Sequence, residues 1–163
     1  MARLAKFGGT DGETLTVTLT EAITIDDRDY GSKQTFTIPA VVDVTRRLVT
    51  VTTTEAVIAT FAAAVGPGQY IAADVMYMRF SNLDDTNFVT LTFRNQDNDE
   101  VAIKLDAGKS LILCGDNSGG MVDMFNATQD ADAASDTNLG DLTNIQADAN
   151  SASVDLEMYI ACK

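Results

Sequence analysis

The chain has 163 residues, of which 45% are hydrophobic and 21% charged, values typical of a folded domain and unlike those of a disordered or membrane-spanning chain. Eleven basic side chains face 24 acidic ones, and the formal charge of −13 at pH 7 disfavours nucleic acid as a partner because phosphate backbones are repelled. No apolar stretch has the length of a signal peptide or a membrane helix, so we expect neither export nor a membrane partner.

Alternation of apolar and polar residues dominates the first part of the chain. Within residues 13–26, Leu15, Val17 and Leu19 alternate with threonine, a β-branched residue suited to the solvated side of a strand, which predicts a first strand. We expect a turn at residues 31–32 and a second strand through residues 35–38. Pro39 then stops central pairing or marks an edge of the sheet.

The next apolar segments are less regular. Residues 48–53 alternate and predict a strand. Residues 56–65 are apolar and rich in alanine, and we interpret them as a strand, with a short helix as the alternative because alanine favours helix. The sequence GPGQ at residues 66–69 then predicts a turn or loop.

The second half of the chain begins with three predicted strands between residues 75 and 105. They are separated by the turn-forming sequences NLDDTN and NQDNDE, whose Asn and Asp side chains satisfy nearby backbone groups. We interpret the three strands as a meander. A turn at residues 107–108 leads to a strand over residues 110–114, and residues 153–163 form the clearest half-buried strand of the chain.

A long acidic segment, residues 115–150, separates those last two strands. It is rich in Asp, Asn, Ser and Gly, and its acids have no local basic partners, so we expect a surface loop on the exposed side of an assembly. Two small apolar groups would pin this loop, the first at Met121, Val122 and Phe125 and the second at Leu142 and Ile145.

Part of this segment has the spacing of a calcium-binding loop. The matching residues are Asp130, Asp132, Asp136, Asn138 and Asp141. The fifth position is Ala134, the glycine needed at the sixth is Ser135, and the last ligand is Asp instead of Glu. We therefore predict a solvated acidic loop and no metal site.

These elements predict an all-β fold, a single antiparallel β-sandwich over residues 1–163 that is jelly-roll-like, with an N-terminal arm at residues 1–12 and the long acidic loop before the last strand. The predicted core consists of Leu15, Val17, Leu19, Phe36, Ile38, Val51, Met78, Phe80, Val89, Leu91, Phe93, Ile103, Leu111, Leu113, Leu156, Met158 and Ile160. A surface position for Phe93 or Leu156 would show a register error of one residue.

The chemistry of common active sites is missing from the sequence. The chain has no histidine, which removes the usual general base and the commonest transition-metal ligand. The sequence AGKS at residues 107–110 lacks the first glycine of a phosphate-binding loop and lies between strands. Cys114 and Cys162 have no metal-ligand spacing and predict two thiols in a reducing compartment, with a disulfide between them as the alternative. We assign no catalytic, cofactor-binding or metal-binding residue.

The order of these segments resembles a group of small all-β virion structural proteins of tailed bacteriophages. The matching features are VMYMRFSNLDDTNFVTLTFRN, VAIKLDAGKSLIL, the variable GDNSGG and the closing SVDLEMYIACK, within residues 75–163. The resemblance implies a capsid decoration or cement protein, or a neck, tail or fibre-base component, located in the virion and assembled in the host cytoplasm. It implies a homotrimer or ring that contacts other virion proteins such as the major capsid protein, and no enzyme site.

Two other classes of function stay open. A ligand-binding or glycan-binding β-sandwich module would be a monomer with one saturable site. An enzyme would need a cluster of acids with raised pKa values in a cleft.

The N-terminal sequence MARLAKFGG generates a first prediction. A short basic segment with a glycine hinge can reach an acidic neighbour and become ordered on docking. Deleting residues 1–9 is therefore expected to weaken assembly without changing the fold, measured by sedimentation and circular dichroism. Unchanged assembly after the deletion contradicts the prediction.

Overall fold

The computed structural model describes residues 12–64, 66–115, 120–121 and 142–163, and most of these residues lie in strands. Within these ranges the helical structure is a short 3-10 turn, η1 (Ala72–Asp74), and no helix is long and apolar enough to cross a membrane. The strands are β1 (Glu13–Glu21), β2 (Thr24–Ile25), β3 (Arg28–Asp29), β4 (Ser32–Val41), β5 (Asp43–Val51), β6 (Ala56–Ala62), β7 (Tyr70–Ile71), β8 (Val75–Asn82), β9 (Val89–Asn95), β10 (Glu100–Leu105), β11 (Ser110–Cys114), β12 (Leu142–Ala149) and β13 (Val154–Cys162).

Some sequence predictions concern residues outside these ranges. They are the N-terminal segment 1–9, the anchors Val122 and Phe125, and the calcium-like spacing from Asp130 to Asp141.

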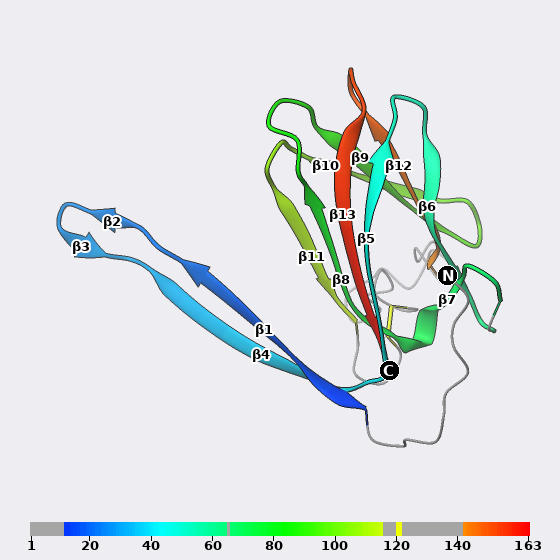
Figure 1. Ribbon diagram of the computed structural model, residues 1–163, viewed down its shortest axis with the longest axis horizontal. Coiled ribbons are helices and arrows are strands. Elements are labelled where there is room, and N and C mark those ends of the chain that lie inside the picture. Colours follow the sequence, from blue (N-terminus) through cyan, green and yellow to red (C-terminus); the bar gives the residue numbers. More distant parts are fainter. Residues whose placement is uncertain (1–11, 65, 116–119, 122–141) are drawn as a thin grey trace, which may run out of the picture.

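Eight of the strands form a sandwich of two antiparallel sheets (Figure 1). One sheet has the order β11-β8-β13-β5, and the other has the order β10-β9-β12-β6, with the short β7 added parallel to β6. In chain order, the first sandwich strand pairs with the last, the second pairs with the seventh, and the third and fourth lie in different sheets. This is the strand order of a jelly roll, so the predicted fold class is confirmed.

The sandwich core lies between the two sheets. Phe93 is 3% exposed and Leu156 is fully buried, so the predicted register is confirmed. Phe80 and Phe93, from opposite sheets, meet edge to face with ring centroids 6.4 Å apart. The predicted core residues found buried here are Val51, Met78, Phe80, Val89, Leu91, Phe93, Leu156, Met158 and Ile160, and the partly buried ones packed against them are Ile103, Leu111 and Leu113.

The other predicted core residues do not lie in the sandwich core, so this part of the prediction is wrong. Leu15, Val17, Phe36 and Ile38 belong to a second apolar cluster on the outer face of the four-stranded sheet, and Leu19 is 40% exposed. The reason is that β1 and β4 are not sandwich strands. Their alternation is real, but the face that it buries lies against the outside of a sheet.

Strands β1 and β4 instead form a long hairpin, which projects far from the sandwich (Figure 1). From here on this hairpin is called the arm, and it is distinct from the N-terminal segment 1–12. Its tip carries β2 and β3, joined at Asp26 and Asp27. Both aspartates have positive φ values, 49° and 60°, as a two-residue hairpin turn of the right twist requires. The turn predicted at residues 31–32 is therefore wrong. Asp tolerates the left-handed conformation, so this pair makes the turn, and Ser32 lies in β4.

The predicted meander over residues 75–105 is also wrong. β9 and β10 do form a hairpin, but β8 lies in the other sheet between β11 and β13. The sequence NLDDTN carries the chain from one sheet to the other, so it is a crossing and not a hairpin turn. Local alternation identifies the strands but holds no information about their partners.

The predicted loop 115–150 ends earlier than expected. Residues 142–149 form β12, which lies between β9 and β6 and buries Leu142, Ile145 and Ala147. Two register shifts interrupt its pairing, and such irregularities break the two-residue period by which a strand is recognised. Met121, which precedes the undescribed part of the segment, is fully buried in the sandwich core, as predicted for an anchor.

The crossing between β8 and β9 generates a stability prediction. Asn82 is 2% exposed, and its Nδ2 donates to the carbonyl oxygens of Asn87 and Leu105 at 2.8 and 3.2 Å. Replacing Asn82 by Ala leaves those acceptors buried without their donor, so we expect a loss of about 1–3 kcal/mol in the free energy of unfolding. Chemical denaturation measures it, with Gln96→Ala at an exposed amide as the control. A loss no larger than that of the control contradicts the structural role of Asn82.

Candidate functional site

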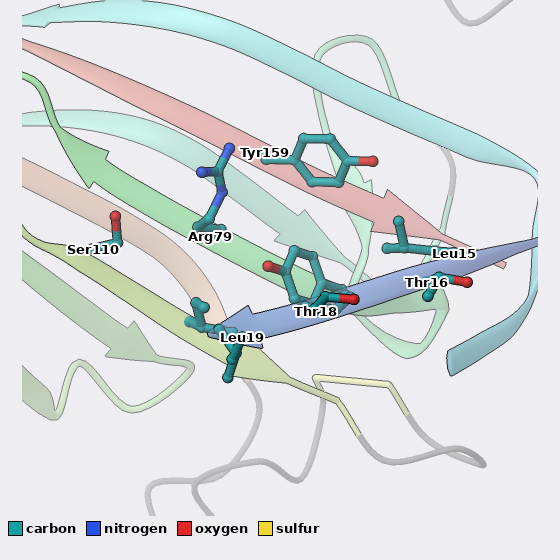
Figure 2. Close-up of a pocket in the computed structure, with 10 residues that line it drawn as sticks. Leu15, Thr16, Thr18, Leu19, Arg79, Ser110 and Tyr159 are labelled. Atoms are coloured by element: carbon teal, nitrogen blue, oxygen red, sulfur yellow. The ribbon is translucent and has the colours of Figure 1, made fainter. Parts of the chain in front are cut away.

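The candidate site is an open groove of about 480 Å³ between β1 and the outer face of the four-stranded sheet (Figure 2). Leu15, Val17 and Leu19 of the arm form one wall. The floor comes from the sheet, with Tyr77 on β8 and Tyr159 on β13. The groove lies where Leu15 and Val17 of the arm face the outer cluster of the sheet.

Aromatic rings give the floor its shape. Tyr77 and Tyr159 meet edge to face with ring centroids 5.9 Å apart and planes at 81°. The guanidinium carbon of Arg79 lies 5.9 Å from the centroid of the Tyr159 ring, and Figure 2 shows these two side chains rising side by side from neighbouring strands. Ile112 of β11 extends the apolar surface. Such a floor suits apolar or stacking contacts.

An ion-pair network borders the groove and connects three strands. Glu157 of β13 accepts from Arg46 of β5 at 2.6 Å and from Arg79 of β8 at 2.5 Å. Two cations share one carboxylate. The hydrogen bond from Arg46, together with the charges of both arginines, lowers the pKa of Glu157 below its usual value of 4.5. Glu157 therefore stays ionised at neutral pH and cannot act as a general acid.

The other titratable groups here are also poor catalysts. Burial raises the pKa of Tyr77 above its usual value of 10.0, so its hydroxyl stays neutral. Partial desolvation raises the pKa of the Cys114 thiol even though the residue is exposed overall, which keeps it from the thiolate form that reacts. Among the described residues, no three His, Cys, Asp or Glu side chains come together to hold a metal ion. The arrangement can bind a surface or a ligand, and these groups supply no acid, base or nucleophile poised for neutral pH.

Sequence reasoning did not find this groove. The sequence assigned no site residues, and in the structure Tyr77 lies in the outer cluster whereas Phe80 lies in the core. The available signal was the presence of Tyr77, Ile112 and Tyr159 at outward positions, where polar residues are usual. This signal did not show what covers these side chains, because no local pattern in the sequence indicates that the arm packs over that face. Cys114 is exposed and Cys162 buried, and neither forms a disulfide.

In the loop between β8 and β9, hydrogen bonds from the backbone lower the pKa of a second carboxylate, that of Asp84. Asp84 Oδ1 accepts from the backbone N–H groups of Asn87 at 2.6 Å and Thr86 at 2.7 Å, and these bonds lower the pKa of Asp84. The carboxylate holds the crossing between the sheets in shape. Asp84 is not among the residues that line the groove.

The Glu157 network generates a pH prediction. Since the folded pKa of Glu157 is lowered, its stabilising contribution is present above pH 4.5 and is lost as the pH falls through the folded pKa. Wild-type protein is expected to exceed Glu157→Gln in unfolding free energy by about 1 kcal/mol or less at pH 7, because Arg46 is largely exposed. Denaturation of both proteins from pH 7 to pH 2 measures the difference. It should vanish at low pH and shrink in high salt, and a difference independent of pH contradicts the network.

Comparisons with known proteins give few matches. No family model matches the sequence, and no curated protein matches it. A solved chain from Bacillus endospore appendages, described as a novel family of disulfide-linked pili, is similar at a TM-score of 0.44 and 13% sequence identity, and the alignment covers 99% of this chain and 98% of that chain.

Proposed function

We propose that this chain is a non-enzymatic virion structural protein of a tailed phage, an auxiliary capsid protein of the decoration or cement type that acts as a homo-oligomer. The observation that carries the proposal is the arm, whose outer part makes no cluster with the sandwich and exposes apolar side chains to solvent. Ordered apolar surface held outside the body of a chain is a feature of proteins that become complete on assembly.

The chemistry of the described residues supports a structural role. The groove offers aromatic and apolar contacts beside an ion pair, with Tyr77 and Cys114 held neutral and Glu157 held ionised. The strong negative charge of the chain keeps neighbouring particles apart in solution and disfavours binding to DNA. These properties suit a protein whose function lies in its edges and surfaces.

The order of segments in residues 75–163 adds the resemblance to virion proteins of tailed phages. It supports as partners other copies of the chain, in a trimer or ring, and the major capsid protein, with the virion as location and assembly in the host cytoplasm. A neck, tail or fibre-base component is the alternative within the same class. No nucleic acid, membrane or cofactor enters the proposal.

One observation favours a second candidate from another class. The tyrosine pair and Arg79 in the groove could stack against the face of a sugar or another flat ligand, as in a glycan-binding module. Such a module would be a monomer with one saturable site. The two candidates therefore differ in oligomeric state before any ligand is known.

The proposal predicts symmetric self-association. Native mass spectrometry and sedimentation velocity of the full chain are expected to show one closed oligomer whose population rises with concentration. A glycan array serves as the counter-test and is expected to show no saturable binding. A monomer at every concentration, with saturable binding of one glycan class, contradicts the structural role and supports the binding module.

A further inference from the structure

The outer part of the arm carries apolar side chains that its own chain leaves uncovered. Ile23, Ile25 and Tyr30 are each more than half exposed. Strands β2 and β3, at the tip, lie far from both sheets (Figure 1). Ordinary surface loops do not group three large apolar side chains, so this tip is a candidate contact surface.

The tip continues a face that is already used at the base of the arm. One register runs along the whole hairpin, from Leu15 opposite Ile38 to Ile25 opposite Arg28, and Tyr30 donates its backbone N–H to Ile23. Because side chains alternate along strands, Ile23, Ile25 and Tyr30 occupy positions on the same face as Leu15 and Ile38. The base of that face is packed on the outer side of the four-stranded sheet, whereas the tip is not.

The same outer side of the sheet has an uncovered portion. On edge strand β5, Val44 and Leu48 are 46% and 58% exposed, and Arg46 lies between them in sequence on the same face. The base of the arm packs over Tyr77, Ile112 and Tyr159, on the other three strands, and leaves β5 open. The molecule therefore exposes two apolar surfaces of similar kind, one on the arm and one on β5.

Charge makes these two surfaces complementary. Arg46 and Arg79 share the single carboxylate of Glu157, and Arg46 is the more exposed of the two. The turn of the arm carries Asp26 and Asp27, whereas Arg28 lies on the apolar face of the tip and Asp29 on the opposite face. The acidic groups that complement Arg46 of β5 are therefore the two aspartates of the turn.

The tip cannot meet β5 of its own chain, because the arm leaves the sheet on the side of β11, the edge opposite β5 (Figure 1). We propose that the outer part of the arm, residues 19–33, docks on the outer face of β5 in a second copy of this chain. The inference deepens the proposed function and rests on it. A contact of arm to strand uses two different surfaces, so repetition of it closes a ring or extends a fibre.

Two variants isolate the two halves of the contact. The arm variant carries Ile25→Ser and Tyr30→Ser, and the strand variant carries Val44→Lys and Leu48→Lys. The matched control is Val57→Lys, on the other sheet, where Val57 is 54% exposed. Circular dichroism and thermal unfolding of each variant establish that the fold is retained.

Sedimentation velocity and native mass spectrometry then give the result. We expect the wild type and the control to assemble and each variant alone to associate at least tenfold more weakly. An equimolar mixture of the two variants is expected to form a one-to-one dimer, because one variant keeps an intact arm and the other an intact β5. Recovery in the mixture also shows that neither variant is merely unfolded.

The opposite results are equally clear. A strand variant that assembles normally, or a mixture that stays monomeric, overturns the arm-to-β5 contact, and so does a control that assembles as poorly as the variants. If the wild type is oligomeric and both variants remain so, the docking inference fails while the proposed structural role stands. If the wild type is monomeric at every concentration, both fail.

Discussion

The pairing of β13 with both β5 and β8 is the constraint on which the rest of the structure depends. This strand is the last element of the chain, and its ladders with the two neighbours join the first strand of the sandwich to the third. Its inward side chains, Leu156, Met158 and Ile160, lie in the core. Its outward ones, Glu157 and Tyr159, form the ion-pair network and part of the groove floor. One alternating strand therefore builds both the interior and the candidate site, and a one-residue slip would exchange them.

The outer face of the four-stranded sheet carries a second apolar surface, in addition to the core between the two sheets. A sandwich ordinarily presents polar side chains outward, but here Tyr77, Ile112 and Tyr159 face outward and are partly covered by the base of the arm. The arm is thus positioned by an apolar contact with the sheet, and its projection follows from the length of β1 and β4 beyond that contact. The groove and the exposed tip are consequences of this arrangement.

The electrostatics of the described residues have structural causes. Glu157 is ionised because two arginines from adjacent strands hold it, and Asp84 is held by backbone N–H groups at a crossing between the sheets. Glu157 therefore stabilises a junction where strands far apart in sequence meet, whereas Asp84 stabilises the local loop that joins β8 to β9. Lowered carboxylate pKa values at such junctions contrast with the raised values that general acids need.

The sequence by itself determined most of the strand segments and which way most of their side chains point, because a two-residue period is a local property of the pleated backbone. It identified β9, β11 and β13, and the burial of Phe93 and Leu156. The tertiary structure alone decided which strands pair, since pairing joins segments far apart in sequence that carry similar patterns. In the structure β8 and β9 lie in different sheets, and β12 is a strand whose register shifts had concealed it in the sequence. Strands β1 and β4 lie outside the sandwich, against its outer face. The groove and the arm could not be predicted for the same reason: each depends on where a non-local partner lies, and alternation records that a face is buried without recording what buries it.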